Sequence, residues 1–246
     1  MQQFFEYRIS DDINEVIGLL DMDPKKRPAV VGCLNPHSFV VALEDERFHE
    51  ALVNCDCLLP DGEGICMAMR RCNGVGISKI AGDDIHRVLM EKMEAICGRV
   101  YYMGSEKMVL SLIKERAARE YPSVSVRWWS PSFCEELSED ESRRIVEDIN
   151  GFAPDVLFVS MTAPKQEKWV EKWRKEMKGV RIVASIGAVF DFYAGTVKRA
   201  PEWAVRMKME WLVRLVKEPR RMWHRNFVST PRFLRWVRKN KSKIVN

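Results

Sequence analysis

The sequence predicts an α/β fold: a mostly parallel, Rossmann-like sheet with helices on both faces, followed by a basic helical C-terminal appendage. Two observations lead to this prediction. Short apolar runs alternate with helical patterns five or six times along the chain, and parallel strands need such crossover helices. Positive charge is concentrated at one end, because residues 201–246 hold 13 Lys and Arg against 3 Asp and Glu. We therefore place an α/β domain at residues 1–195 and the appendage at residues 196–246.

The first predicted strand is the apolar run at residues 29–34. Asn35 follows as a helix N-cap and Pro36 occupies the first helical position. Further apolar runs predict strands at residues 55–59, 99–103, 124–128, 155–160 and 180–186. Amphipathic spacing predicts helices after residue 105, around 145–149 and over 166–177.

Polar residues and glycines follow the ends of several predicted strands. In parallel sheets, ligands bind beyond the carboxyl ends of the strands. The candidate site is therefore formed by Asn35, Asp61, Gly104, residues 162–166 and residues 187–191.

Asp61 has two interpretations. It follows an apolar run and stands between Pro60 and Gly62, so a tight turn would hold its carboxylate at the mouth of the crevice. A carboxylate there can act as a general base. Alternatively, it caps the helix that follows.

Other classes of site lack their signatures. The chain has no complete G-x-G-x-x-G, no G-x-x-x-x-G-K-[ST], no G-x-S-x-G and no H-E-x-x-H. The seven cysteines lack paired metal-site spacing, which indicates reduced thiols and no bound metal. Three of the four histidines, at 37, 49 and 86, are interpreted as surface or packing residues of helices. No apolar run is long enough for a membrane span, and the start of the chain does not resemble a secretory signal.

Four blocks of sequence resemble the WecG/TagA/CpsF glycosyltransferase family over about residues 28–235. They are residues 59–65 (LPDGEGI), 154–167 (PDVLFVSMTAPKQE), 187–201 (GAVFDFYAGTVKRAP) and 210–219 (EWLVRLVKEP). The resemblance implies transfer of an N-acetylmannosamine-type or related hexose from a UDP-sugar to a polyprenyl-diphosphate-linked saccharide in bacterial cell-surface polysaccharide synthesis. It also implies inversion at the anomeric carbon and no required metal or other cofactor.

The resemblance assigns roles to individual residues. Asp61 matches the catalytic base, Asn35 would orient substrate hydroxyls and Gln166 would line the sugar pocket. Gly104, Gly187 and Asp191 fall on the nucleotide side, whereas Lys79 stands where an arginine is usual. Without a metal, the charge of the departing diphosphate needs fixed cations, and the matching positions are Arg214, Arg221 and Arg225.

The appendage mixes cations with Trp and Phe, a composition that suits an anionic membrane surface. We expect the protein to be cytoplasmic and peripheral on the inner face of the cell membrane, where its lipid-linked acceptor resides. We expect no nucleic-acid partner. The alternative is a non-catalytic nucleotide- or nucleic-acid-binding α/β protein, but no RNA-binding signature supports it. The sequence leaves open whether the chain forms a homo-oligomer.

Overall fold

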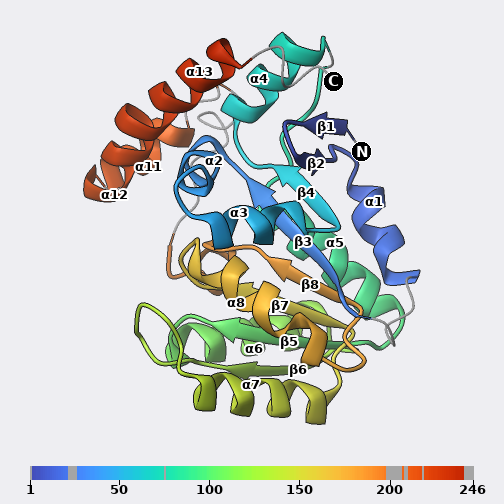
Figure 1. Ribbon diagram of the computed structural model, residues 1–246. Coiled ribbons are helices and arrows are strands. Elements are labelled where there is room, and N and C mark those ends of the chain that lie inside the picture. The colour runs from blue at the N-terminus through green and yellow to red at the C-terminus, as the bar shows by residue number, and fades with distance from the viewer. Residues whose placement is uncertain are drawn as a thin grey trace.

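The computed structural model describes residues 2–21, 27–74, 76–197, 207, 210–217 and 219–240. Within them an eight-stranded sheet has the order β1-β2-β4-β3-β8-β7-β5-β6 (Figure 1). The strands are β1 (Gln2–Phe4), β2 (Tyr7–Ile9), β3 (Ala29–Leu34), β4 (Cys57–Pro60), β5 (Arg99–Gly104), β6 (Ser125–Trp129), β7 (Val156–Ser160) and β8 (Ile182–Ser185).

All strand pairs from β2 to β6 are parallel, and only β1 pairs antiparallel with β2. The predicted α/β class is therefore confirmed, and each predicted strand is present with ends shifted by a few residues. The β1–β2 hairpin was not predicted, because strands of three residues are too short to show a clear alternation.

Helices cover both faces of the sheet, as predicted (Figure 1). One face packs against α2 (Pro36–Ala42), α3 (Glu46–Val53), α7 (Glu139–Phe152) and α8 (Lys165–Trp173). The other packs against α1 (Ile13–Gly18), α5 (Gly82–Ala95), α6 (Lys107–Glu120) and α9 (Val189–Ala194). Short 3-10 turns follow α1 at Leu19–Asp21 and α8 at Arg174–Glu176, so the helix expected over 166–177 ends earlier.

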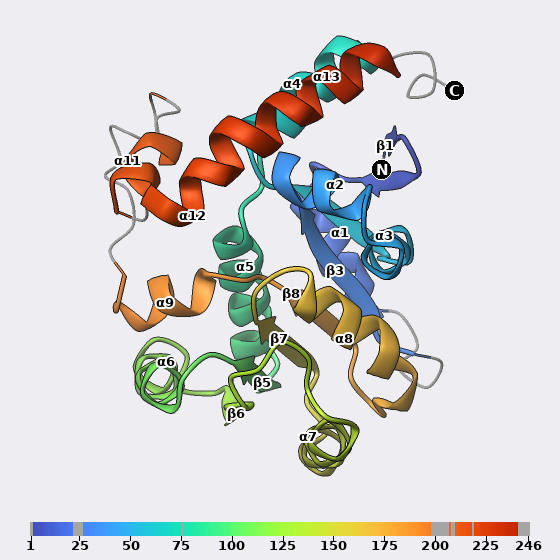
Figure 2. The ribbon, with the colours of Figure 1, turned by 60° about the vertical axis from the view of Figure 1, so that its left-hand side comes forward.

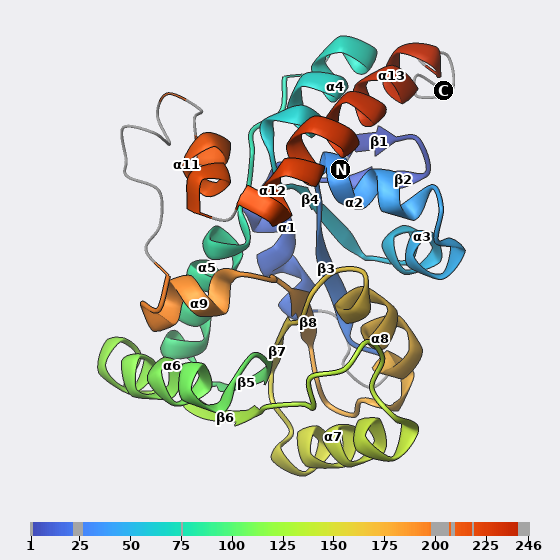
Figure 3. The same cartoon turned by 90° about the vertical axis from the view of Figure 1, so that its left-hand side faces the viewer.

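The appendage runs through α11 (Glu210–Lys217), α12 (Pro219–Trp223), the π-helical segment η3 (His224–Ser229) and α13 (Thr230–Lys239). Figures 2 and 3 show these helices at the opposite end of the molecule from α6 and α7. There α13 packs against α2 and α4 (Glu63–Asn73). Phe233 of α13 is fully buried, with its ring 5.1 Å from that of Phe39 and 6.3 Å from that of Phe4. An apolar contact therefore fixes the appendage on the α/β domain.

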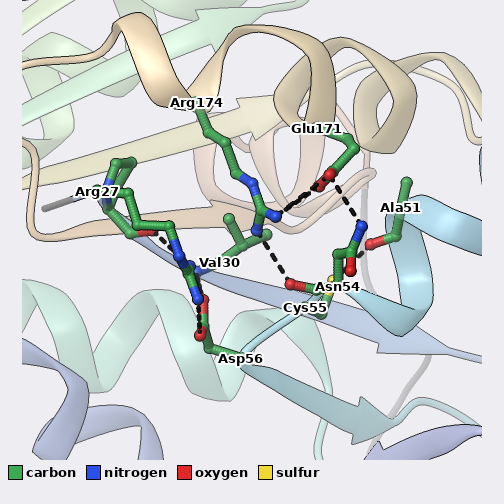
Figure 4. Close-up of polar contacts among 9 residues, drawn as sticks. Arg27, Val30, Ala51, Asn54, Cys55, Asp56, Glu171 and Arg174 are labelled. Atoms are coloured by element: carbon green, nitrogen blue, oxygen red, sulfur yellow. Dashed lines mark hydrogen bonds and ion pairs between the residues drawn. The ribbon is translucent and has the colours of Figure 1, made fainter.

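A polar cluster ties the chain together at the amino ends of β3 and β4 (Figure 4). The two terminal guanidinium nitrogens of Arg27, Nη1 and Nη2, donate to the Asp56 carboxylate at 2.6 and 2.7 Å. Asp56 also accepts from the Val30 amide at 2.9 Å. Burial raises the pKa of Asp56, but these hydrogen bonds and the Arg27 charge together hold it below its ordinary value. The buried Arg174 donates to the Asn54 carbonyl at 3.0 Å and pairs with Glu171. This cluster lies at the edge opposite the predicted site.

Candidate active site

Asn35 and Asp61 lie side by side at the carboxyl ends of two neighbouring strands. Leu34 of β3 is in register with Pro60 of β4, and the Asp61 amide donates to the Leu34 carbonyl at 2.9 Å. The parallel sheet thus brings together two candidate residues that are 26 positions apart in the sequence.

Asn35 caps α2, as the sequence predicted. Its Oδ1 accepts from the amides of His37 and Ser38, both at 3.0 Å, and the Ser38 hydroxyl accepts from the Asn35 amide at 2.9 Å. This capping box fixes the side chain at the edge of the sheet. Its Nδ2 group makes no hydrogen bond within the described residues, so that donor remains for a ligand.

Asp61 does not cap the helix that follows it. The N-cap of α4 is Gly62, at φ 125°, and no side chain bonds the first helical amides. Capping, one of the two interpretations of Asp61, is therefore wrong. The half-buried Asp61 carboxylate makes no hydrogen bond or ion pair with the described part of the chain. Its position leaves it available to a substrate.

Glycines bring the backbones of β5, β7 and β8 close together at the same edge. A Cβ on Gly104, at φ 121°, would lie 1.9 Å from the Ser160 carbonyl oxygen, so any larger residue would clash with the backbone. The Ser160 hydroxyl donates to the carbonyl of Gly187, another positive-φ glycine. Gly104 and Gly187 therefore lie at the ends of β5 and β8, on either side of β7, at the expected edge of the sheet.

Gln166 and Glu167 form a buried pair at the start of α8. Gln166 Oε1 accepts from the Met161 amide at 3.1 Å, and its Nε2 donates to Glu167 Oε1 at 2.8 Å. Burial raises the pKa of Glu167 to about 7, although the hydrogen bond from Gln166 favours the carboxylate. Its second oxygen is buried without a hydrogen-bond partner within the described residues. Gln166 lies at the predicted edge of the sheet. The sequence analysis did not single out Glu167, its buried partner.

Lys79 and Asp191 are both half-buried. Lys79 lies in the loop before α5, where the next amide, of Ile80, donates to the Pro60 carbonyl at 3.2 Å. Asp191 is in the first turn of α9, four residues after Gly187. Lys79 thus lies close to the end of β4, and Asp191 follows the end of β8.

The three predicted arginines are on the appendage. Arg214 lies on α11 and Arg221 on α12, but their side chains are outside the described part of the structure. Arg225 is half-buried in η3 and lies close enough to His37 of α2 to lower its pKa. The appendage thus reaches the helix that Asn35 caps.

The contact between α2 and η3 also involves two histidines whose pairing no sequence pattern predicted. His37 Nδ1 lies 2.9 Å from Ser229 Oγ, and the His37 and His224 rings are 5.9 Å apart. A surface or packing role was expected for His37. It lies two residues from Asn35 and packs at the junction of α2 with the appendage.

A cavity of about 370 Å³ lies beyond the end of β6, next to the candidate site. The Ser130 hydroxyl on its rim donates to the Ser105 carbonyl at 2.9 Å, immediately after Gly104. The cavity is lined by Lys107, Trp128, Trp129, Ser130, Ser132, Glu141 and Arg144. None of the predicted site residues lines it.

The described residues contain no cluster of three or more His, Cys, Asp or Glu side chains arranged to hold a metal ion. None of the helices in those same residues is both long and apolar enough to cross a bilayer.

Comparison with known proteins decides the family. The model of the glycosyl transferase WecG/TagA/CpsF family matches residues 2–245, nearly the whole chain. The chain belongs to this family. It is accordingly a glycosyltransferase, and the resemblance found in the sequence blocks is confirmed.

Curated relatives of this family member share one name, N-acetylglucosaminyldiphosphoundecaprenol N-acetyl-beta-D-mannosaminyltransferase. A relative from Bacillus spizizenii is 29% identical over 88% of this chain and 81% of its own length. One from Bacillus subtilis is 29% identical over 95% of this chain and 84% of its own length. One from Staphylococcus aureus is 23% identical over 85% of this chain and 80% of its own length.

Proposed function

We propose that this glycosyltransferase moves an N-acetylmannosamine-type or related hexose from a UDP-sugar to a polyprenyl-diphosphate-linked saccharide, in the synthesis of a bacterial cell-surface polysaccharide. The shared name of the relatives carries the proposal, because it specifies both the sugar and an undecaprenyl-diphosphate-linked acceptor. Asp61 and Asn35, at the carboxyl ends of β4 and β3, supply groups suited to that chemistry.

In the proposed reaction, Asp61 removes the proton from the acceptor hydroxyl. The hydroxyl oxygen attacks the anomeric carbon of the donor, the bond from that carbon to the diphosphate oxygen breaks, and UDP leaves with inversion. The available, half-buried carboxylate supports this role. Asn35, whose Nδ2 remains a donor, is well placed to orient a sugar hydroxyl beside it.

Negative charge builds on the departing diphosphate and must be met by fixed donors. We assign this role to Arg214, Arg221 and Arg225, with no metal required. The position of η3 against α2 supports it for Arg225. The glycines at the ends of β5 and β8 would let the nucleotide approach the backbone.

We further infer that residues 196–246 bind the inner face of the cell membrane, where the acceptor is anchored. Exposed apolar side chains on the described part of the appendage support this: Met207, Trp211, Val216, Trp223, Phe227, Val228 and Leu234. Cations such as Arg235 and Arg238 lie among them and would attract anionic lipid.

The deciding experiment is a panel of UDP-sugars tested for UDP release with a short-chain prenyl-diphosphate-GlcNAc acceptor. The panel comprises UDP-N-acetylmannosamine, UDP-N-acetylmannosaminuronic acid, UDP-glucose and UDP-N-acetylglucosamine. We expect acceptor-dependent release with the first donor and no stimulation on adding divalent cations. If no donor reacts and UDP itself does not bind, the proposal is wrong.

A further inference from the structure

The junction between α2 and η3 gathers three nitrogen-bearing side chains from two distant parts of the chain. His37 comes from the first turn of α2, whereas His224 and Arg225 begin η3. Ser229 Oγ lies 2.9 Å from His37 Nδ1, and the two imidazole rings meet at 81° with their centres 5.9 Å apart. The cluster adjoins Asn35, and through it the candidate base Asp61.

Among the described residues, the side chains whose charges act on His37 are basic. Burial is the main cause that lowers the pKa of His37, to about 4, and the charges of Arg225 and His224 add to it. Glu44, beyond the other end of α2, is paired with Arg232 of α13. An anion placed between His37 and Arg225 would relieve this repulsion.

The segment η3 supplies one further donor. It is a π-helix of six residues, and such wide turns are frequently found at functional sites. Within it, the Asn226 Nδ2 group is buried and has no hydrogen-bond partner in the described residues. Because a buried donor without an acceptor is costly, this amide too is suited to bind a ligand oxygen.

We propose that the α2–η3 junction is a binding site for a diphosphate group, and that His37 is the contribution of α2 to it. When the Ser229 hydroxyl donates to Nδ1, His37 carries its proton on Nε2 and presents a neutral donor. Arg225 supplies charge and His224 a second imidazole from the other side. The inference rests on the proposed function, which provides two sources of the group: the UDP of the donor and the prenyl diphosphate of the acceptor.

The test compares His37→Gln and His224→Gln with a matched control, His49→Gln. His49 lies on a different helix, α3, and both of its ring nitrogens already have hydrogen-bond partners. Nδ1 lies 2.8 Å from the Tyr7 hydroxyl and Nε2 lies 2.6 Å from the Glu6 carboxylate. Calorimetric titrations would use three probes: UDP, the short-chain prenyl-diphosphate-GlcNAc, and inorganic pyrophosphate. We expect both junction variants to weaken pyrophosphate binding about fivefold or more, as befits the loss of a hydrogen bond to a charged group. The control should change it less than twofold.

The probes separate the outcomes. Weakened UDP binding assigns the site to the donor, and weakened prenyl-diphosphate binding assigns it to the acceptor. If wild-type protein transfers sugar but neither junction variant weakens any probe, this inference is overturned and the proposed function stands. If wild-type protein transfers no sugar but His37→Gln still weakens pyrophosphate binding, the site stands without the proposed function. Because His224 is exposed, its variant provides a test even if His37→Gln does not fold.

A second readout excludes a merely structural role for His37. In histidine NMR spectra of the wild-type protein, saturating pyrophosphate should raise the pKa of His37 above its ligand-free value, because the anion offsets Arg225 and His224. The ring resonances of His49, which lies on α3, serve as the control and should not shift when pyrophosphate is added. An unchanged His37 titration in the presence of bound pyrophosphate would contradict the inference.

Discussion

At the scale of single residues, Asn35 and Asp61 are neighbours with different hydrogen bonding. The side-chain oxygen of Asn35 accepts from amides in the first turn of α2. Gly62, not Asp61, is the N-cap of α4, and the Asp61 carboxylate makes no hydrogen bond with the described residues. Asn35 can therefore serve as a fixed donor and Asp61 as an acceptor of a proton.

Replacing Asp61 by Asn should lower kcat about 10²- to 10⁴-fold, the usual contribution of a general base. The amide has nearly the same shape but does not take up the proton, so folding should be unchanged. Initial rates of acceptor-dependent UDP release would measure the effect, with the exposed Asp140→Asn as control. Wild-type turnover in Asp61→Asn would remove Asp61 from the mechanism.

Glu167 makes stability depend on pH. Its folded-state pKa of about 7 lies above its ordinary value of 4.5, so the folded protein holds the proton more tightly than the unfolded chain does. The free energy of unfolding should therefore fall as pH rises from about 4.5 to about 7 and then level off. Glu167→Gln removes this contribution. The free energy of unfolding of the variant, relative to that of the wild type, should therefore increase by about 2 kcal/mol from pH 5 to pH 8. Urea unfolding at the two pH values would show it; parallel pH dependences would refute it.

At the scale of elements, α13 is an amphipathic helix that docks by its apolar side. Phe233 and Val237 are buried, whereas their neighbours Leu234 and Arg235 are exposed. The rings of Phe4, Phe39 and Trp236 complete the contact with the core. The N-terminal hairpin, α2 and α13 thus share one aromatic cluster, although α13 is far from the other two in the sequence.

Phe233→Ala should loosen this aromatic contact at a cost of about 3–5 kcal/mol, typical of removing a buried aromatic side chain. Hydrogen exchange should accelerate through η3 and α13 while the sheet strands stay protected. The adjacent Leu234→Ala, which truncates a side chain 46% exposed, is the matched control. Uniformly faster exchange throughout the chain would instead show that the appendage and core unfold together.

At the scale of the whole molecule, the appendage carries a concentration of exposed apolar side chains. The ring centroids of Trp223 and Phe227 are 4.5 Å apart, and the two residues are 60% and 47% exposed. Residues 1–200 carry a net charge of −5 and residues 201–246 one of +10. An anionic membrane would therefore orient the molecule with the appendage toward the lipid.

The double variant Trp223→Ser/Phe227→Ser should reduce binding to phosphatidylglycerol vesicles several-fold, because it removes aromatic anchors that enter the interface. Vesicle flotation would measure it, with Met108→Ser, an equally exposed apolar side chain on α6, as control. Binding should also weaken with added salt. Equal flotation with phosphatidylcholine, or none at all, would contradict the docking model.

The sequence by itself determined the alternation of strands and helices, the edge of the sheet where the candidate residues gather, and the N-cap role of Asn35. These depend on local signals: apolar runs, helical spacing and the Asn-Pro start of α2. The family blocks added the reaction class and candidate roles for residues such as Asp61 and Gln166.

Only the tertiary structure decided which distant groups meet. The release of Asp61 from capping, the buried Gln166–Glu167 pair and the junction of His37 with His224 and Arg225 depend on packing between segments far apart in the chain. His37 and Ser229 are separated by 192 positions, and no local pattern encodes their approach. The burial of Phe233 against Phe39 holds α13 on α2 and so places η3 beside the site, because removing that apolar surface from water favours one docking geometry.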